Sequence, residues 1–596
     1  MNNTTGLIAQ IVPDLPTFAV DDGFAYKVPE DLLGLRVGSI VRVPLGARRI
    51  RGYVVSTRNG DTAKLKPVIS VSGDQAVFDD ALLQTLRWAA LHYVAPLSVL
   101  LGRAAPPNLP RGKGRTLKAI APSLASPLPD VSQKAAAGTR VRPTCYISGG
   151  PYGKTIGEIA NEPLRSGRSV AVVAPTVDEA EQLAATLTEV YGDRVLYVSS
   201  ALASKDATKV WVTASRSAPV LIIGTPEIAL WPLGNPAMWI VVEEGRRAMK
   251  SKQTPTLQVR DLIRRRALVE RTSVVFLGPV PTLDTLAKGA AVVEPVGRAW
   301  PLVELIDRRE DQPGGRALSA RTMHAINRVA KRGGQVFVFV SRRGYAPAFR
   351  CVRCRELRRC PECGSGPDRA EKCKRCGASL GPCVKCGGRR FEPLGAGIGR
   401  VAEELQRYLG EDRVGPIKSG RQVLVGSERD LPYVPETALT VAVDADSLLM
   451  APNYRAEDDA TRLLARVALT VARGTGRRCL IQTGQPQHRA LQVLHGGHPM
   501  EFLNTLNRER ERDHLPPASS LVAVEASGDV TSYATDIEVL AGEGTQVHGP
   551  EVGGGRTRWF IQGESIQGAM VQLRTVVQRW RDAGVKVRVD ADPIDL

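Results

Sequence analysis

The sequence predicts a multidomain α/β protein with two lobes built on parallel sheets, and three observations lead to this prediction. Short apolar runs of strand length alternate with helical stretches from residue 144 onward, and the pattern resumes at 333–344. A cysteine-rich stretch interrupts the second series. β-rich runs precede the lobes and a small α+β pattern follows them. The 596 residues suffice for about three to five domains with cores of their own.

The elements follow one another in a simple order. β-rich runs separated by Pro, Gly and Asp occupy 7–57, and apolar residues at helical spacing occupy 80–101, with a break at Pro96. We divide the chain into an N-terminal domain (1–104), a linker rich in Pro, Gly, Ser and basic residues (105–143), a first lobe (144–300), the first part of a second lobe (301–350), a cysteine insertion (351–390), the second part of that lobe (391–515) and a small α+β C-terminal domain (516–596).

The composition favours a polyanionic partner. Lys and Arg number 80 against 61 Asp and Glu, which gives a net charge of +19, and such a balance most often accompanies nucleic-acid binding. The alternative is a solvated basic surface of the kind found in Arg-rich proteins from high-GC genomes. The sequence has no apolar run of 18 residues and no secretory leader, so we expect no membrane partner and a cytoplasmic location.

The strongest local signal is a set of four C-x2-C pairs. Eight of the ten cysteines lie between Cys351 and Cys386. Two such pairs close a tetrahedral Zn²⁺ site with Zn–S distances of roughly 2.3 Å, so four pairs predict two closed, structural zinc sites. Glycines after three of the pairs suit the turns around the metal (Gly364, Gly377 and Gly387). The alternatives are pairs without metal, disulfides and an iron–sulfur cluster.

The cysteine segment is also basic. Residues 351–390 carry eleven Arg and Lys against four Asp and Glu. A metal-stiffened basic segment could contact a phosphate backbone or another protein, and the sequence does not choose between the two.

Several segments together resemble the bacterial replication-restart family of PriA, also called primosomal protein N-prime. They are FAYKVPE…VGSIVRVPLGARRIRGYVVS near the N-terminus, SRRGYAP before the first cysteine pair, the eight nested cysteines, and VKVRVDADPIDL at the C-terminal end. The resemblance implies that the two lobes are RecA-like helicase lobes. It also implies a nucleoid-associated monomer that binds forked or single-stranded DNA, primosome and helicase-loading proteins, and single-stranded-DNA-binding protein.

The resemblance further implies a pairing of the cysteines. The outer pairs would bind one zinc ion (Cys351, Cys354, Cys383 and Cys386) and the inner pairs the second (Cys360, Cys363, Cys373 and Cys376).

The resemblance also implies a pocket for a DNA 3′ end. The pocket positions are occupied by Phe24, Gly46 and Lys66. Phe24 would stack on a base, Gly46 would let the backbone approach the sugar, and Lys66 would pair with phosphate. Ala25 stands where the family has an Asp that would bind the terminal nucleotide, which puts 3′-end selectivity in question. The alternative is that Phe24 is a core residue and Lys66 a solvated charge.

The chain departs from the family at its ATP-hydrolysing motor. The phosphate cradle G-x-x-x-x-G-K-[ST] is SGGPYGKT here, residues 148–155, with Pro151 and Tyr152 in the loop. The Asp-Glu-x-His element is EEGR, residues 243–246, and the Ser-Ala-Thr-Pro element is GPVP, residues 278–281. The sixth element, residues 466–473, has Thr470 at the first arginine-finger position, where one arginine can be worth about 10³–10⁵ in rate.

These losses predict a motor fold that serves as a scaffold. We expect no catalytic residue and only a vestigial nucleotide site (Gly153, Lys154, Thr155 and Glu244), which leaves the binding of ATP and Mg²⁺ in question. The linker 105–143 is too short and polar for the winged-helix domain of active relatives, so we expect that domain to be absent. The alternative is an active ATP-dependent 3′–5′ DNA helicase that uses Lys154, Thr155 and Glu244.

Overall fold

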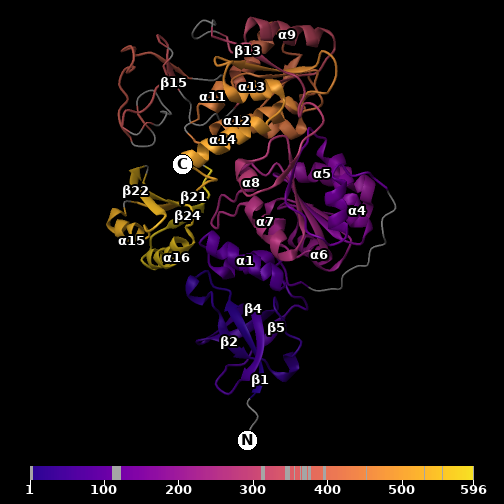
Figure 1. The fold of residues 1–596 in the computed structure, drawn as a ribbon, viewed down its shortest axis with the longest axis vertical. Helices are drawn as coiled ribbons and strands as arrows, with labels where there is room; N and C mark the ends of the chain where they lie inside the picture. Colours follow the sequence, from indigo (N-terminus) through magenta and orange to yellow (C-terminus); the bar gives the residue numbers. More distant parts are fainter. Residues whose placement is uncertain are drawn as a thin grey trace.

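A computed structural model describes the chain except for residues 1–4, 111–122, 310–315, 342–348, 355, 363, 365–371, 374–376, 394–396, 452, 529, 554 and 595–596. The predicted fold class is confirmed, since two lobes of parallel sheet covered by helices form the body of the molecule. In Figure 1 the N-terminal sheet lies at one end, the two lobes are stacked above it, and the C-terminal domain and the strand β15 of the cysteine segment lie to one side.

The N-terminal domain is a five-stranded antiparallel sheet of order β2-β1-β4-β3-β5. Its strands are β1 (Thr5–Pro13), β2 (Phe24–Lys27), β3 (Ile40–Leu45), β4 (Arg48–Asp61) and β5 (Ser70–Ser72). The stretch 66–69 closes the sheet on itself: Lys27 N–H donates to the Lys66 carbonyl at 3.0 Å, and Ile69 N–H donates to that of Arg42 at 2.9 Å. A small core that includes Ile11, Val43 and Val54 fills the interior.

Two short helices tie this sheet to the rest of the molecule. They are α1 (Asp80–His92) and α2 (Leu97–Ala104), with Pro96 at the break where the sequence predicts it. Their apolar faces belong to one continuous core that also includes Trp239 of the first lobe and Trp580 of the C-terminal domain. The N-terminal helices therefore pack as part of the body (Figure 1).

The first lobe is a seven-stranded parallel sheet of order β12-β6-β11-β10-β7-β9-β8. The strands are β6 (Thr144–Ile147), β7 (Ser169–Val173), β8 (Val195–Val198), β9 (Leu221–Gly224), β10 (Pro236–Val242), β11 (Ser273–Gly278) and β12 (Ala291–Val293). The helices are α4 (Tyr152–Arg165), α5 (Val177–Tyr191), α6 (Ser204–Arg216), α7 (Val259–Glu270) and α8 (Leu283–Ala287). The central strands β7 and β9 to β11 are almost wholly buried, as expected for a sheet with both faces covered.

The second lobe is a six-stranded parallel sheet of order β13-β20-β19-β14-β18-β17. The strands are β13 (Val303–Asp307), β14 (Val336–Phe339), β17 (Val414–Gly415), β18 (Val423–Gly426), β19 (Leu439–Ala442) and β20 (Arg478–Thr483). The helices are α9 (Ala320–Lys331), α10 (Ile398–Leu409), α11 (Asp446–Leu449), α12 (Ala456–Ala468), α13 (Arg489–Gly496) and α14 (Met500–Arg512). The cysteine segment leaves this lobe after β14 through a two-stranded ribbon, β15 (Phe349–Cys351) and β16 (Phe391–Pro393).

The C-terminal domain is a four-stranded antiparallel sheet of order β22-β23-β21-β24 with two helices. Its elements are β21 (Ser520–Ser527), α15 (Ala534–Glu538), β22 (Thr545–Gly553), β23 (Arg556–Gly563), α16 (Gln567–Asp582) and β24 (Val587–Ala591). The apolar runs SSLVAVEA, TRWFIQG and VKVRVDADP predict β21, β23 and β24, and the helical spacing of 567–584 predicts α16. No such run predicts β22, which is an exposed edge strand without an apolar alternation.

The stretch expected to be a linker contains regular structure. Pro129–Ala136 forms the helix α3, which packs on α4 through Val131 and Ala135. The Pro, Gly and Ser content of the whole stretch hides this short amphipathic turn of helix. Residues 111–122 of the same stretch lie outside the described part of the chain.

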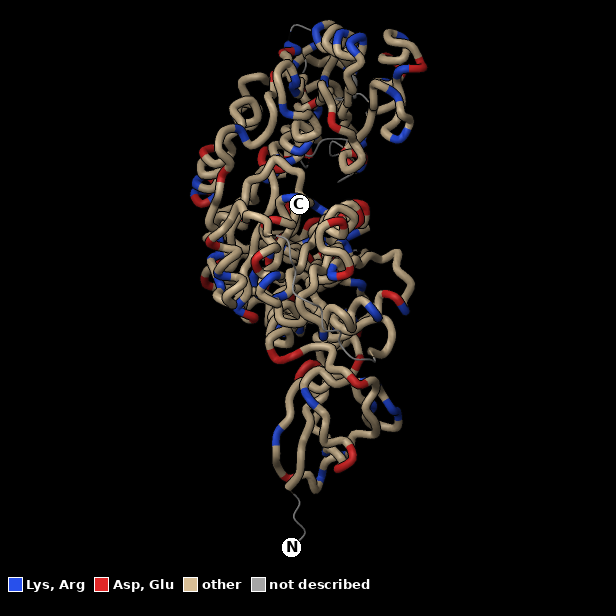
Figure 2. Tube along the Cα trace, turned by 90° about the vertical axis from the view of Figure 1, so that its right-hand side faces the viewer, with Lys and Arg blue, Asp and Glu red and all other residues tan. Residues whose placement is uncertain are grey.

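Two surface properties bear on possible partners. Figure 2 shows Lys and Arg spread over the length of the molecule and interspersed with Asp and Glu. Among the described residues, no helix has the length and apolar character needed to cross a membrane.

Candidate functional sites

The predicted DNA-end residues lie on three neighbouring segments of the N-terminal sheet. Phe24 begins β2, Gly46 lies in the β3–β4 turn with a φ of +58°, and Lys66 lies in the stretch that closes the sheet. The Tyr26 hydroxyl donates to the Pro44 carbonyl at 3.1 Å and so ties β2 to the end of β3. Phe24 and Tyr26 share one face of β2, because side chains two apart in a strand point the same way.

The exposure of these residues corrects one alternative. Phe24 is 41% exposed, so it is not the core residue that the alternative interpretation makes of it. Phe24 lies at the start of a strand, where neighbouring residues cover its ring only in part. Lys66 is exposed too, and no atom lies within 4 Å of the position a Cβ on Gly46 would take. An exposed aromatic ring, an open turn and a cation are groups that can contact a nucleotide.

The cysteine segment is built from repeated tight turns. In three of the four C-x2-C pairs the N–H of the following glycine donates to the carbonyl of the first cysteine, at 2.8–2.9 Å. These glycines have φ between +68° and +75° (Gly364, Gly377 and Gly387), a conformation that side chains with a Cβ rarely adopt.

The structure brings the two outer pairs together. The sulfur atoms of Cys351, Cys354, Cys383 and Cys386 all lie within 4.8 Å of one another, and two cross-pair Sγ–Sγ distances, 351 to 386 and 354 to 383, are 3.5 Å. Four thiols at this spacing form a donor set that suits a tetrahedral soft metal ion such as Zn²⁺. Of the inner pairs, Cys360 and Cys373 are buried, whereas Cys363 and Cys376 lie outside the described residues.

The ionisation of the outer cysteines fits a shared cation. Hydrogen bonds from the backbone N–H of Cys354 and from neighbouring groups lower the pKa of the Cys351 thiol to about 7. At Cys354 the backbone of Glu356 favours the thiolate, but the neighbouring sulfur atoms raise the pKa of its thiol to about 12. Four adjacent thiolates repel one another, so a bound cation is what allows all of them to ionise.

Two residues that the sequence does not single out support this cluster. A Cβ on Gly388 would lie 3.0 Å from the sulfur of Cys351 and 3.3 Å from that of Cys386. The Arg358 guanidinium stacks on Phe391 at 3.9 Å and donates to the carbonyls of Leu380 and Gly381, both at 2.8 Å. The G-G pair after the last cysteine is the only signal in the sequence for the first of these contacts.

The segment predicted to be the phosphate cradle, residues 148–155, is partly covered by protein atoms. Lys154 is exposed, and its Nζ lies 3.9 Å from Glu158 on its own helix. The Thr155 hydroxyl lies 3.4 Å from the Pro151 carbonyl, to which it donates. On the outer side of Gly149, a Cβ would meet Ala299 O at 2.6 Å and Arg473 Nη2 at 2.9 Å. The end of the first lobe and Arg473 of the second lobe therefore lie against the loop.

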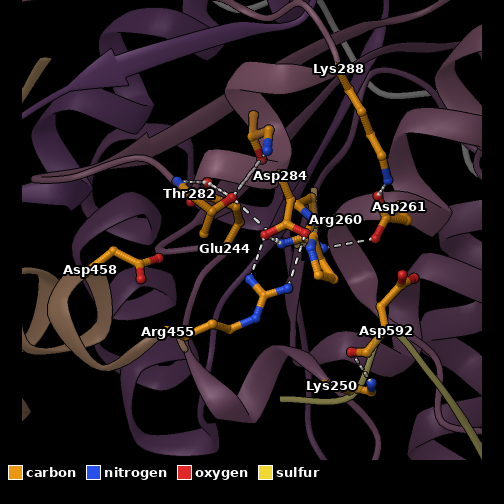
Figure 3. A network of polar contacts seen from close by, with 12 residues as sticks. Glu244, Lys250, Arg260, Asp261, Thr282, Asp284, Lys288, Arg455, Asp458 and Asp592 are labelled. Atoms are coloured by element: carbon orange, nitrogen blue, oxygen red, sulfur yellow. Dashed lines mark hydrogen bonds and ion pairs between the residues drawn. The ribbon is translucent and has the colours of Figure 1, made fainter. Parts of the chain in front are cut away.

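The two acidic residues after β10 are both engaged. Glu244 is buried, and its Oε1 accepts from the N–H and the hydroxyl of Thr282 at 2.9 and 3.1 Å (Figure 3). Glu243 has a φ of +49° and accepts from the Tyr152 hydroxyl at 3.0 Å. Burial and the adjacent Glu243 raise the pKa of Tyr152 well above its usual range, so this phenol remains a donor.

Helix α12 of the second lobe faces these acidic residues with a row of arginines. Arg455 caps the start of the helix, and Arg462 and Arg466 follow within it at intervals of seven and four residues, on the same side. Arg466 Nε lies 2.7 Å from Glu243, and Arg455 bonds both oxygens of Asp284 at 2.7 and 3.3 Å. The spacing is visible in the sequence, but the partners across the cleft are not.

Comparison with known proteins fixes the relationship of the chain. Residues 10–106 match the PriA family model described as the 3′DNA-binding domain (3′BD). The replication restart protein PriA of Treponema pallidum is 24% identical over 98% of this chain and 99% of its own length. The chain is thus similar to PriA proteins along nearly its whole length.

Other PriA proteins match over shorter spans. The probable PriA of Mycobacterium tuberculosis is 25% identical over 86% of both chains. The Bacillus subtilis PriA is 24% identical over 65% of this chain, and the match spans about half (54%) of its own length.

Two solved helicase structures are also similar. RecG bound to a three-way DNA junction is 14% identical, with a TM-score of 0.33, 65% of this chain covered and 45% of that one. The DEAD-box helicase Mss116 bound to ssRNA is 10% identical, with a TM-score of 0.35 and coverage of 62% and 77%.

Proposed function

We propose that this chain is a replication-restart protein that binds stalled or repaired forks and promotes origin-independent reloading of the replicative helicase. The observation that carries the proposal is the similarity to PriA along nearly the whole chain, together with the matched 3′ DNA-binding domain. Its partners would be forked or single-stranded DNA, primosome and helicase-loading proteins, and single-stranded-DNA-binding protein. It would act as a monomer at the nucleoid, in the cytoplasm.

The cysteine segment would hold two structural zinc ions. The clustered thiols of Cys351, Cys354, Cys383 and Cys386 support the first site. The second would use Cys360, Cys363, Cys373 and Cys376. The protein contributes the turns and the sulfur ligands, and zinc when bound would supply rigidity to a segment with little core of its own.

The protein would bind DNA without unwinding it. Glu244 is the residue that could activate water, and its Oε1 is occupied by Thr282 inside the protein. Glu243 is bonded to Tyr152 and Arg466, so it is not free to position Mg²⁺. The second candidate, an ATP-dependent 3′–5′ helicase, has in its favour the retained Gly153, Lys154 and Thr155.

The test combines binding and turnover on one sample of metal-loaded protein. We expect tight binding to forks with a 3′ end at the branch and no DNA-stimulated ATP hydrolysis. Phe24→Ala removes the exposed ring, and because one stacked base is worth about 1–3 kcal/mol, binding of such forks weakens roughly 5- to 150-fold. Fluorescence anisotropy measures the binding.

Leu33→Ala is the matched control, because Leu33 is also an exposed apolar residue of the same domain, at 59%. Equal binding of forks with and without a 3′ end, unchanged by Phe24→Ala, would contradict the pocket. ATP turnover that Lys154→Ala abolishes would establish the helicase instead.

A further inference from the structure

The cleft between the lobes, where a helicase holds its nucleotide, is filled by the protein's own charged side chains. Glu179 and Glu243 come from the first lobe and Glu428 from the second. Arg466 contacts Glu243 at 2.7 Å and Glu428 at 2.9 Å, and Arg246 contacts Glu179 as well as Glu243. The cluster thus joins three carboxylates to two guanidinium groups across the cleft.

Charge and burial make this cluster a poor place for a nucleotide. The side chains of Glu243 and Arg466 are each only 8% exposed. The carboxylates of Glu179, Glu243 and Glu428 occupy this space, and each of them repels the phosphates of ATP. A nucleotide would have to break buried ion pairs in order to enter, and removing one partner of a buried pair is strongly unfavourable.

A second contact lies at the other end of the same helix. Asp284 on α8 of the first lobe accepts two hydrogen bonds from Arg455 and also pairs with Arg260 at 3.3 Å (Figure 3). Arg455 and Arg466 are eleven residues apart, so about 16 Å of helix separates the two contacts. Two such points fix the orientation of one lobe on the other, whereas one would leave it free to turn.

The backbone of Glu243 gives independent support. Its φ of +49° lies in the left-handed region, which a glutamate rarely adopts. Such a conformation persists only where the surroundings determine it, and here Tyr152, Arg246 and Arg466 all hold the side chain.

We propose that helix α12 clasps the two lobes together, with Arg466 bridging them where a helicase uses a bound nucleotide. The lobes are then held closed at all times, and the grip on DNA does not depend on ATP. This inference builds on the proposed loss of the motor and adds that the loss fixes the lobes in one orientation.

Hydrogen exchange on the full-length, metal-loaded protein tests the clasp. In the wild type, exchange at 148–156 and 428–434 is unchanged by Mg²⁺ with ATP or with a non-hydrolysable analogue. Arg466→Met raises the exchange rate of both segments at least tenfold. The matched control is Arg489→Met, because Arg489 pairs only with Glu457 and Glu509 of its own lobe among the ion pairs of the described chain.

A second variant separates the clasp from general instability. Glu243→Gln combined with Arg466→Met removes both buried charges of that contact, and Glu428 keeps Arg246 at 3.9 Å. The melting temperature therefore recovers while exchange in the two segments stays fast. The proposal would be overturned if nucleotide slowed hydrogen exchange in the wild type. It would also be overturned if the two segments exchanged in Arg466→Met at the wild-type rate. Fork binding, measured separately, reports on the proposed function alone: its absence leaves the exchange result standing.

Discussion

Asp284 shows how a single buried carboxylate can hold two lobes in contact. Burial alone would raise the pKa of this carboxyl, but the guanidinium groups of Arg260 and Arg455 hold it well below the usual range. The carboxyl group of Asp284 is therefore ionised in the folded protein at neutral pH. Both arginines are buried, so water cannot solvate their charges if the carboxylate is lost.

Asp284→Asn should lower the free energy of unfolding by about 3–5 kcal/mol at pH 7, because it leaves two buried arginines without that charge. The depressed pKa also sets a pH dependence. The contribution of Asp284 is complete above the pKa of the unfolded chain, about 3.9, and is lost as the pH falls below it toward the folded value. Urea unfolding between pH 3 and 7 measures both effects.

Asp307→Asn is the control for this measurement, since Asp307 pairs with Arg309 at the surface with 41% of its side chain exposed. Its loss should change stability by less than about 1 kcal/mol. A stability curve for Asp284→Asn that falls with acid as steeply as the wild-type curve would show that other groups cause the pH dependence.

Among the elements, the cysteine turns combine local geometry with one long-range approach. Three of the four turns close within five residues through a glycine, but the four-sulfur cluster forms only when the ribbon β15–β16 brings 351–354 and 383–388 together. Gly388 lies at that approach with no room for a side chain. The turns are thus specified locally, whereas the complete ligand set depends on packing.

Gly388→Ala should weaken metal binding about tenfold, the lower end of the range for changes beside the ligands, because its Cβ would press on two sulfur atoms. Competition with a chromophoric chelator measures the affinity. Gly381→Ala serves as control, since no atom lies within 4 Å of its Cβ position and its φ is not positive. Equal affinities for the two variants would argue against a metal held by the outer pairs.

In the molecule as a whole, the C-terminal strand and the residues after it join four parts of the chain. The buried Lys250 of the first lobe donates to the carbonyls of Ala591 and Asp592, both at 2.6 Å, and pairs with Asp590 (Figure 3). His92 of α1 lies 3.2 Å from Asp592, and Asn453 of the second lobe donates to the Ile594 carbonyl at 2.8 Å.

Lys250→Met should release the C-terminal domain from the body of the molecule. The change removes the buried cation that pairs with Asp590 and the donor to two carbonyls, and leaves Asp590 only Arg588 at 2.8 Å, at a cost of roughly 3–5 kcal/mol. Calorimetry should then resolve a separate transition of lower melting temperature, and trypsin should cut near residue 516 sooner than in the wild type. Lys134→Met, at an exposed i,i+4 pair with Asp130, should melt like the wild type; a single unchanged transition for Lys250→Met would contradict this role.

Prediction from sequence reaches the elements better than their contacts. Apolar runs predict most strands of both lobes, and C-x2-C-G predicts three of the four cysteine turns, because these signals are local. The edge strand β22 is missed because apolar and polar residues do not alternate along it. The exposure of Phe24 is missed because it depends on how distant segments pack around the ring. Arg466 and Glu243 are more than 200 positions apart in the chain, so no local pattern could pair them.

The parallel pairing of β13 with β20 has a consequence for the order in which the chain folds. Val303 pairs with Cys479, so the sheet of the second lobe cannot be completed until a segment that follows the cysteine turns has been synthesised and docked. Pairings so distant in sequence form slowly, whereas turns of a few residues close in microseconds or less. During synthesis the thiols are therefore presented before the lobe that carries them exists, and early metal capture would protect them from oxidation and mispairing in the nascent chain.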